Sequence, residues 1–85
     1  MEKYYWYSQC VNCNQGRLIL TEDTTNKRMY LHCEECERGW LNPQEAHDNS
    51  KGFLALEEDF ETDNPNIETI TIYGWKSIAM HSFSE

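Results

Sequence analysis

The order of hydrophobic and polar residues predicts three strands in the first half of the chain. Residues 3–8 (Lys-Tyr-Tyr-Trp-Tyr-Ser) are mostly aromatic, and residues 17–21 and 28–32 are short runs dominated by apolar side chains. Such residues favour the pleated surface of a strand. The polar segment 22–27 predicts a turn between the second and third runs. We therefore expect a three-stranded antiparallel sheet over residues 4–41.

The second half begins with weaker patterns. Asn42 can cap a short helix, and Pro43 suits its first position, with one or two turns continuing to residue 47. Residues 48–52 break that helix. The apolar run 53–56 fits either a strand or a helix.

Asn64 followed by Pro65 is a cap-like start for a helix, and two patterns compete after it. Isoleucines at positions 67 and 70 have helical spacing, but residues 69–73 (Thr-Ile-Thr-Ile-Tyr) alternate and are partly β-branched, as in a strand. We expect a helix that ends at Gly74, with Trp75 folding back on the last turn. A strand over this segment is the alternative.

The large apolar side chains predict two cores. We expect Trp40 to lie beneath the second cysteine pair, against Leu18 or Leu20. The second half has its own expected core of Phe53, Leu56, Ile67, Ile70, Trp75 and Ile78. Trp6 lies on a strand with aromatic residues on both faces. We expect the C-terminal half to cover the second face, and an exposed partner surface is the alternative.

The chain contains four cysteines, arranged as two Cys-x-x-Cys pairs: Cys10, Cys13, Cys33 and Cys36. Two such pairs are typical of a closed tetrahedral zinc site. A chain of 85 residues has a small core and needs such a staple. We expect one structural zinc, with backbone amides donating to the sulfurs. Disulfides and an iron site are the alternatives. We expect Gly16 to take a positive φ in the turn beneath the metal.

The three histidines are not expected to bind metal or to act in catalysis. His32 precedes Cys33 on a predicted strand and should point away from the metal. His47 and His81 are isolated from any nucleophile and orienting carboxylate. We therefore expect a non-enzymatic protein with no small-molecule substrate. A metalloenzyme would need an open coordination position, which four thiolates do not leave.

The charge is concentrated in the second half. Residues 1–42 have five Lys/Arg and six Asp/Glu, whereas residues 43–85 have two Lys and nine Asp/Glu, so the halves carry −1 and −7 of the total −8. Such a balance repels phosphates and favours a basic protein partner. The expected docking residues are Glu57, Glu58, Asp59, Glu61 and Asp63. A solvated face is the plain alternative, and calcium binding is disfavoured because the run lacks the spacing of an EF-hand loop.

A nucleic-acid-associated or transcription-related protein is the rival function. It would act through Arg17, Lys27, Arg28 and Arg38, which are few against the total charge. The first six residues lack a basic region followed by an apolar run, and no apolar stretch approaches 18 residues. We therefore expect a cytoplasmic, single-domain protein over residues 1–85, without a membrane span.

The paired Cys-Val-Asn-Cys and Cys-Glu-Glu-Cys motifs make residues 4–41 resemble the zinc-ribbon fold group. This resemblance implies a zinc ribbon in which two cysteine knuckles hold a three-stranded sheet. For the whole chain we expect an α+β fold in which residues 42–85 form an acidic, helix-containing extension packed against the ribbon. The layout beyond the ribbon, with Phe-Leu-Ala-Leu-Glu-Glu-Asp-Phe and a later Ile-Tyr-Gly-Trp, resembles small bacterial zinc-ribbon proteins. Some of these are similar to immunity or antitoxin partners of secreted toxins. The resemblance implies a protein that binds and neutralises a cognate toxin, and many such toxins are basic nucleases.

Overall fold

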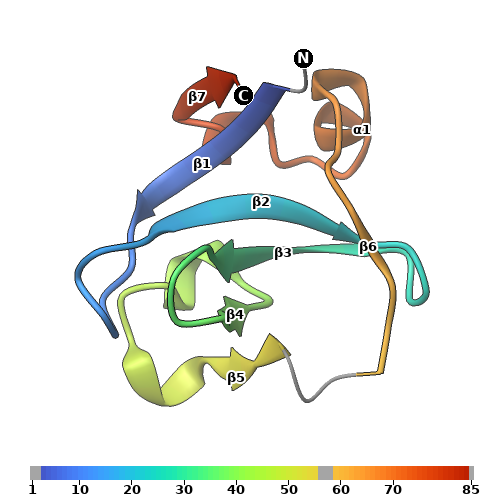
Figure 1. The fold of residues 1–85 in the computed structure, drawn as a ribbon. Coiled ribbons are helices and arrows are strands. Elements are labelled where there is room, and N and C mark those ends of the chain that lie inside the picture. Colours follow the sequence, from blue (N-terminus) through green and yellow to red (C-terminus); the bar gives the residue numbers. More distant parts are fainter. Residues whose placement is uncertain (1–2, 56–58, 85) are drawn as a thin grey trace.

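A mostly antiparallel sheet dominates the computed structural model, which describes residues 3–55 and 59–84 (Figure 1). Its seven strands in that part of the chain are β1 (Lys3–Gln9), β2 (Arg17–Asp23), β3 (Arg28–Cys33), β4 (Arg38–Trp40), β5 (Phe53–Leu54), β6 (Thr62–Asp63) and β7 (His81–Ser84). The other elements are the helix α1 (Ile67–Ile72) and the 3₁₀ turns η1 (Pro43–Glu45), η2 (Asn49–Lys51) and η4 (Lys76–Ile78). The described residues form a small α+β fold.

The central hairpin forms where the hydrophobic pattern predicts it. Strands β2 and β3 pair antiparallel from Leu18 opposite Cys33 to Asp23 opposite Arg28. Asp23 is fully buried at the turn, where it accepts hydrogen bonds from Asn26 N (3.0 Å), Asn26 Nδ2 (2.8 Å) and Arg28 Nε (2.8 Å). A buried carboxylate needs such donors because it has lost its water. Asp23 therefore fixes the turn that joins these strands.

The sheet is larger than the expected three strands, because the second half contributes to it. The strand order is β5-β4-β3-β2-β1-β7, with β6 paired to the end of β2 (Figure 1). Strand β7 pairs with β1 so that Tyr4 lies opposite Phe83 and Trp6 opposite His81. The second half is thus built into the sheet as well as packed against it.

One face of the sheet carries the hydrophobic core. Leu18, Leu20 and Leu31 are fully buried there together with Trp40, whose position agrees with the prediction. Ile70 of α1 belongs to the same buried cluster. The indole N–H of Trp40 donates to the backbone oxygen of Asp48 at 3.0 Å, which ties the segment after β4 to this core.

The prediction of a separate core for the second half is wrong. Ile70 joins the core of the first half, and Ile67 is partly exposed. Phe53 lies against Tyr30, with ring centroids 5.6 Å apart, because β5 continues the sheet through β4. Trp75 and Ile78 do pack against the shared core. Leu56 lies outside the described residues.

Helix α1 is set by its two caps. Asn66 begins it by accepting a hydrogen bond from Thr69 N at 2.8 Å, so the cap is Asn66 where we expected Asn64. At the other end, Trp75 N donates to Ile70 O (2.9 Å) and Gly74 takes a φ of 79°. This is the predicted Schellman ending. These capping interactions and the burial of Ile70 stabilise a helix here, although the alternation of residues 69–73 favours a strand.

The earlier predicted helix is shorter than expected. Asn42 accepts from Gln44 N at 2.9 Å, as its capping position requires, but η1 is a single 3₁₀ turn. A second 3₁₀ turn, η2, follows at once and is capped by Asp48. Among the described residues, no helix has the length and apolar character needed to cross a membrane.

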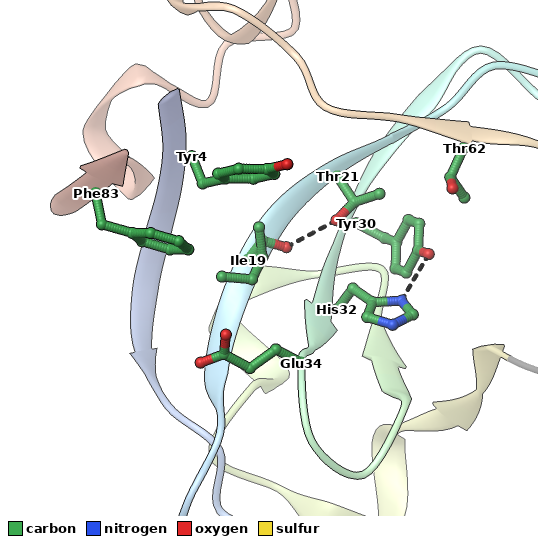
Figure 2. A pocket seen from close by; sticks show the side chains of 8 residues that line it. All are labelled: Tyr4, Ile19, Thr21, Tyr30, His32, Glu34, Thr62 and Phe83. Carbon is green, nitrogen blue, oxygen red and sulfur yellow. Dashed lines mark hydrogen bonds between the residues drawn. The ribbon is translucent and has the colours of Figure 1, made fainter. Parts of the chain in front are cut away.

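The second face of the sheet is rich in aromatic rings. Trp6 stacks on His81 with ring centroids 4.3 Å apart, and Tyr4 stacks on Phe83 at 5.2 Å. Strand β7 lies beside β1 in the sheet, so it extends this face instead of covering it as predicted, and Trp6 is half-buried through its contact with His81. Figure 2 shows the remaining hollow, with side chains of β1 and β7 on one side and of β3 on the other.

Candidate metal centre

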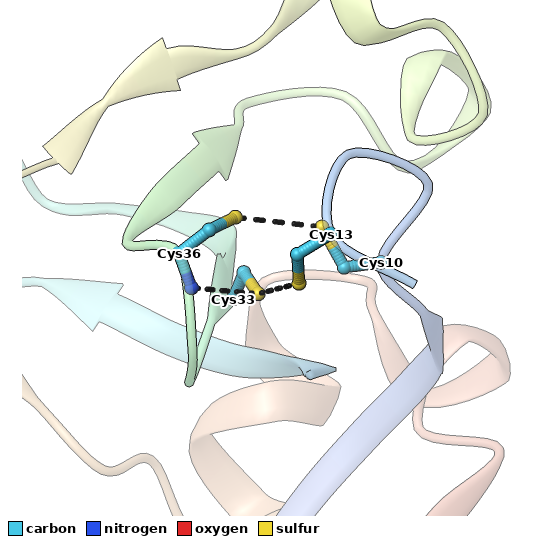
Figure 3. Close-up of side chains that lie close together, drawn as sticks. All are labelled: Cys10, Cys13, Cys33 and Cys36. Atoms are coloured by element: carbon cyan, nitrogen blue, oxygen red, sulfur yellow. Dashed lines mark hydrogen bonds between the residues drawn. The ribbon is translucent and has the colours of Figure 1, made fainter. Parts of the chain in front are cut away.

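The four cysteines come together at one end of the sheet (Figure 3). Their Sγ atoms all lie within 4.8 Å of one another, with Cys10 and Cys36 3.7 Å apart and Cys13 and Cys33 3.6 Å apart. Disulfide sulfurs would be about 2.0 Å apart. The four thiols are free and face one common point.

The pairing of β2 with β3 brings the two cysteine pairs together. Knuckle 1 (residues 10–16) leads into β2, and β3 leads into knuckle 2 (residues 33–37). Leu18 lies opposite Cys33, so both knuckles meet at the same end of the hairpin. Glu34 N also donates to Arg17 O at 3.2 Å across this junction.

The two knuckles have the same backbone design. Asn14 N donates to Cys10 O at 3.0 Å, and Glu37 N donates to Cys33 O at 3.2 Å. Asn14 and Glu37 each stand four residues after the first cysteine of their pair, and both have left-handed φ values, 57° and 63°. Each knuckle therefore turns sharply enough to present two sulfurs to one point.

Backbone amides donate to the sulfurs, as predicted. Cys10 Sγ accepts from Asn12 N, and Cys13 Sγ accepts from Gly16 N, each at 3.4 Å. Cys33 Sγ accepts from Glu35 N and from Cys36 N, also at 3.4 Å. Such outer donors orient metal-binding thiolates and stabilise their negative charge.

Gly16 has a different role from the predicted one. The left-handed residue of knuckle 1 is Asn14, and Gly16 is not among the positive-φ residues. A β-carbon on Gly16 would lie 2.6 Å from Cys33 Sγ and 2.9 Å from Glu35 Cγ. Gly16 is therefore required by the close approach of the second knuckle.

The environment divides the thiols into two kinds. Amide donors at Gly16 and Gln15 lower the pKa of Cys13 to about 6. Burial raises the pKa of Cys10 and of Cys33, which are almost inaccessible. Burial alone would also raise the pKa of Cys36. Hydrogen bonds from Asn12 and the Arg38 backbone outweigh this effect, so the pKa of Cys36 is lowered.

The cluster has the geometry of a four-thiolate site. Sulfurs bound at about 2.3 Å to a tetrahedral zinc lie about 3.8 Å apart, close to the two Sγ separations of 3.6 and 3.7 Å. The sulfur-only donor set suits a thiophilic metal such as zinc. The four cysteines could hold one metal ion.

His32 lies beside the cluster and points away from it, as predicted. Its Nε2 lies 2.6 Å from Glu37 Oε2, and its Nδ1 lies 2.8 Å from the hydroxyl of Tyr30. His32 thereby holds the side chain of Glu37, whose backbone has the left-handed conformation. This role of Glu37 was not predicted from the sequence, and His32, five residues before it, was the available signal.

Three of the five predicted docking residues lie in the described part of the chain. Glu57 and Glu58 lie outside the described residues, and Asp59, Glu61 and Asp63 are exposed. The segment around Glu61 is held against the β2–β3 turn. Glu61 O accepts from Thr24 N at 3.0 Å, and Glu61 N donates to Thr25 Oγ1 at 2.8 Å.

The candidate basic residues do not form a free patch. Arg17 Nε lies 2.6 Å from Glu34 Oε2, and Arg28 Nε lies 2.8 Å from the buried Asp23. Lys27 is exposed at the β2–β3 turn. His47 and His81 are exposed.

Comparison with protein-family models, with curated proteins and with solved structures gives no match. The four clustered cysteines within a mostly antiparallel sheet are consistent with a zinc-ribbon-like fold.

Proposed function

We propose that this chain is a non-enzymatic protein-binding module that binds a basic protein and is stabilised by one structural zinc. The observation that carries the proposal is the position of the acidic segment. Asp59, Glu61 and Asp63 are all exposed, and hydrogen bonds to the β2–β3 turn hold the segment on the sheet. With a formal charge of −8, such a surface attracts a basic partner from solution.

The proposed zinc acts as a staple. Four thiolates fill a tetrahedral site and leave no position for water or substrate. Binding would contribute about 10–16 kcal/mol to folding at neutral pH, which is comparable to the whole stability of a small domain. Function then resides on the protein surface, and the metal maintains that surface.

A nucleic-acid-binding role receives less support. Two of the four candidate cations, Arg17 and Arg28, have their guanidinium groups bound to Glu34 and Asp23. Binding phosphate would require breaking these pairs while the remaining surface repels the ligand.

An immunity-type inhibitor is the specific form of the function that we favour. The layout of the chain resembles such proteins, and an acidic inhibitor suits a basic toxin because complementary charge speeds association. The location in the cell would be the cytoplasm, where a toxin has to be neutralised and where thiols stay reduced.

Association kinetics test the proposal. The partner that co-purifies with the tagged chain is purified, and its association rate with the zinc-loaded protein is measured at low and high salt. Reversing three charges together (Asp59→Lys, Glu61→Lys, Asp63→Lys) should slow association about tenfold or more at low salt and flatten the salt dependence.

A matched control uses a carboxylate elsewhere. Glu68 is exposed on α1, outside the acidic segment, so Glu68→Lys should have a much smaller effect than Asp63→Lys. A co-purified partner that is acidic, or an association rate that the triple variant leaves unchanged, would contradict the proposal.

A further inference from the structure

The four cysteines differ in their access to solvent. Cys10 and Cys33, the first cysteine of each knuckle, are 1% and 0% exposed. Cys13 and Cys36, the second cysteine of each knuckle, are partly exposed. An oxidant in solution therefore approaches the cluster through the second cysteine of each knuckle.

The close sulfur contacts cross between the knuckles. Cys36 Sγ lies 3.7 Å from Cys10 Sγ, and Cys13 Sγ lies 3.6 Å from Cys33 Sγ (Figure 3). Each contact joins a partly exposed cysteine to a buried cysteine of the other knuckle. Thiols that react with peroxide are typically accessible and stand beside a second thiol that completes a disulfide. Both contacts have this arrangement.

Exposure and contact together select one disulfide pattern. Four cysteines can form two disulfides in three ways. A link between Cys10 and Cys33 would join the two buried residues, so neither member could react first with the oxidant. Links within each knuckle would join Cys10 to Cys13 and Cys33 to Cys36, whereas the close contacts lead from each knuckle to the other. Crossed disulfides therefore follow from the contacts that already exist.

Crossed disulfides would also hold the fold together. They would join residues 20 and 26 positions apart in the sequence, at the end of the hairpin where Leu18 pairs with Cys33. A disulfide between distant residues stabilises a fold by restricting the unfolded chain. A link within one knuckle would leave the two knuckles unconnected. The crossed pattern thus joins the same two segments that a shared metal would join.

We propose that hydrogen peroxide oxidises Cys13 and Cys36, and that each then forms a disulfide with the buried cysteine it contacts, Cys33 and Cys10. This removes the four thiolate ligands, so the zinc is released while the crossed disulfides keep the knuckles together. In a reducing compartment such disulfides are transient and report oxidation. The inference rests on the proposed zinc for the metal release and is independent of the basic partner.

The reaction balances with two molecules of hydrogen peroxide. The Cys13 thiolate attacks one peroxide oxygen, the O–O bond breaks, and hydroxide leaves, which gives a sulfenic acid. The Cys33 thiolate attacks this sulfur, the S–O bond breaks, and a second hydroxide leaves as the S–S bond forms. Two electrons pass from the sulfurs to the peroxide, and solvent protons convert both hydroxides to water. Cys36 and Cys10 react in the same way with the second peroxide.

A peroxide titration tests the pairing. The reduced, zinc-loaded full chain receives hydrogen peroxide in small steps while a chromophoric chelator records released zinc and a thiol reagent counts the remaining thiols. We expect about two equivalents of peroxide to release the zinc and consume all four thiols. Trypsin and a glutamate-specific protease, which cuts between Cys33 and Cys36, then give fragments for tandem mass spectrometry. The links found should be Cys13–Cys33 and Cys10–Cys36.

The same chain oxidised in urea is the matched control. Without a fold to position the sulfurs, it should give a mixture of the three pairings. Far-ultraviolet circular dichroism adds an independent measurement. The oxidised, metal-free chain should keep the spectrum of the zinc-loaded protein, whereas the reduced, metal-free chain should lose it. Dithiothreitol together with zinc should restore the thiols and the bound metal.

Several results would overturn the inference. They are links within the knuckles, a Cys10–Cys33 link, sulfinic acid at Cys13 without a disulfide, four thiols that survive excess peroxide, or crossed links in a chain that has lost its sheet. If the chain binds zinc but the links differ, the structural zinc stands and this inference falls. If the chain binds no zinc, the proposed zinc falls, and the disulfide pattern of the oxidised chain still tests the pairing.

Discussion

A β-carbon added to Gly16 would lie 2.6 Å from the sulfur of Cys33. These two residues belong to different knuckles, and Gly16 N also donates to Cys13 Sγ. The first knuckle therefore packs so closely against the second that residue 16 has no space for a side chain. The position of each cysteine pair thus depends on the backbone of the other knuckle.

The variant Gly16→Ala should therefore weaken metal binding and stability together. The added methyl group must displace a ligand sulfur or the Glu35 side chain, and overpacking of this kind costs about 1–3 kcal/mol. We expect zinc affinity to fall about tenfold or more in competition with a chromophoric chelator. Gln15→Ala, at an exposed neighbour, is the control. Equal affinity of Gly16→Ala and wild type would show that the knuckles do not approach so closely.

The variant Gly74→Ala tests the end of α1. Gly74 has a φ of 79°, and a β-carbon there would meet nothing within 4 Å, so only the backbone conformation opposes the substitution. We expect a loss of about 1 kcal/mol in the free energy of unfolding by urea. Gly74→Asn should lose less, because asparagine tolerates the left-handed region better. The absence of any difference between alanine and asparagine would argue against the Schellman ending.

The sequence predicts the metal centre better than it predicts the sheet around it. The spacing of Cys10 and Cys13 is a local property, because a tight turn fixes where both sulfurs point. The pairing of Trp6 with His81 is a long-range property of the chain. Strand β7 has only four, mostly polar residues, and their pattern is too weak to predict which strand they pair with. Strand β6 was missed for the same reason, with only two residues paired to β2.

Local chemistry also explains which helix details were predicted. Gly74 identified the end of α1 because a left-handed position favours glycine. The start was misplaced because Asn64 and Asn66 are both good caps, and only the fold selects Asn66. Likewise, the role of Gly16 depends on the second knuckle, which no local pattern around residue 16 contains.

The pH dependence of stability should include a loss at high pH through Tyr30. Burial, together with the nearby carboxylates of Asp23 and Glu37, raises the pKa of Tyr30 to about 12. A group whose pKa is raised on folding stabilises the protein below its unfolded pKa, here about 10. That contribution is lost as the pH rises from about 10 to 12, and a shift of about two pKa units corresponds to about 3 kcal/mol at most.

Absorbance at 295 nm measures this ionisation directly. In the zinc-loaded protein, one tyrosine should ionise only near pH 12, in step with unfolding, and Tyr30→Phe should lack that phase. The stability of Tyr30→Phe relative to wild type should rise across the same pH range. Complete ionisation of all five tyrosines near pH 10 in the folded protein would contradict the buried position of Tyr30.

The proposed structural role of the metal requires one ion held by four thiolates in a closed site, and cobalt substitution tests this most directly. The metal-free, reduced chain is titrated with Co²⁺ while visible absorbance and far-ultraviolet circular dichroism are recorded together. We predict saturation at one equivalent, the intense bands of tetrahedral four-thiolate cobalt, and folding that advances with the bands, with Cys10→Ser and Cys36→Ser each losing both. A spectrum of five- or six-coordinate cobalt would contradict the account. So would circular dichroism showing that the metal-free wild type and both cysteine variants are already fully folded.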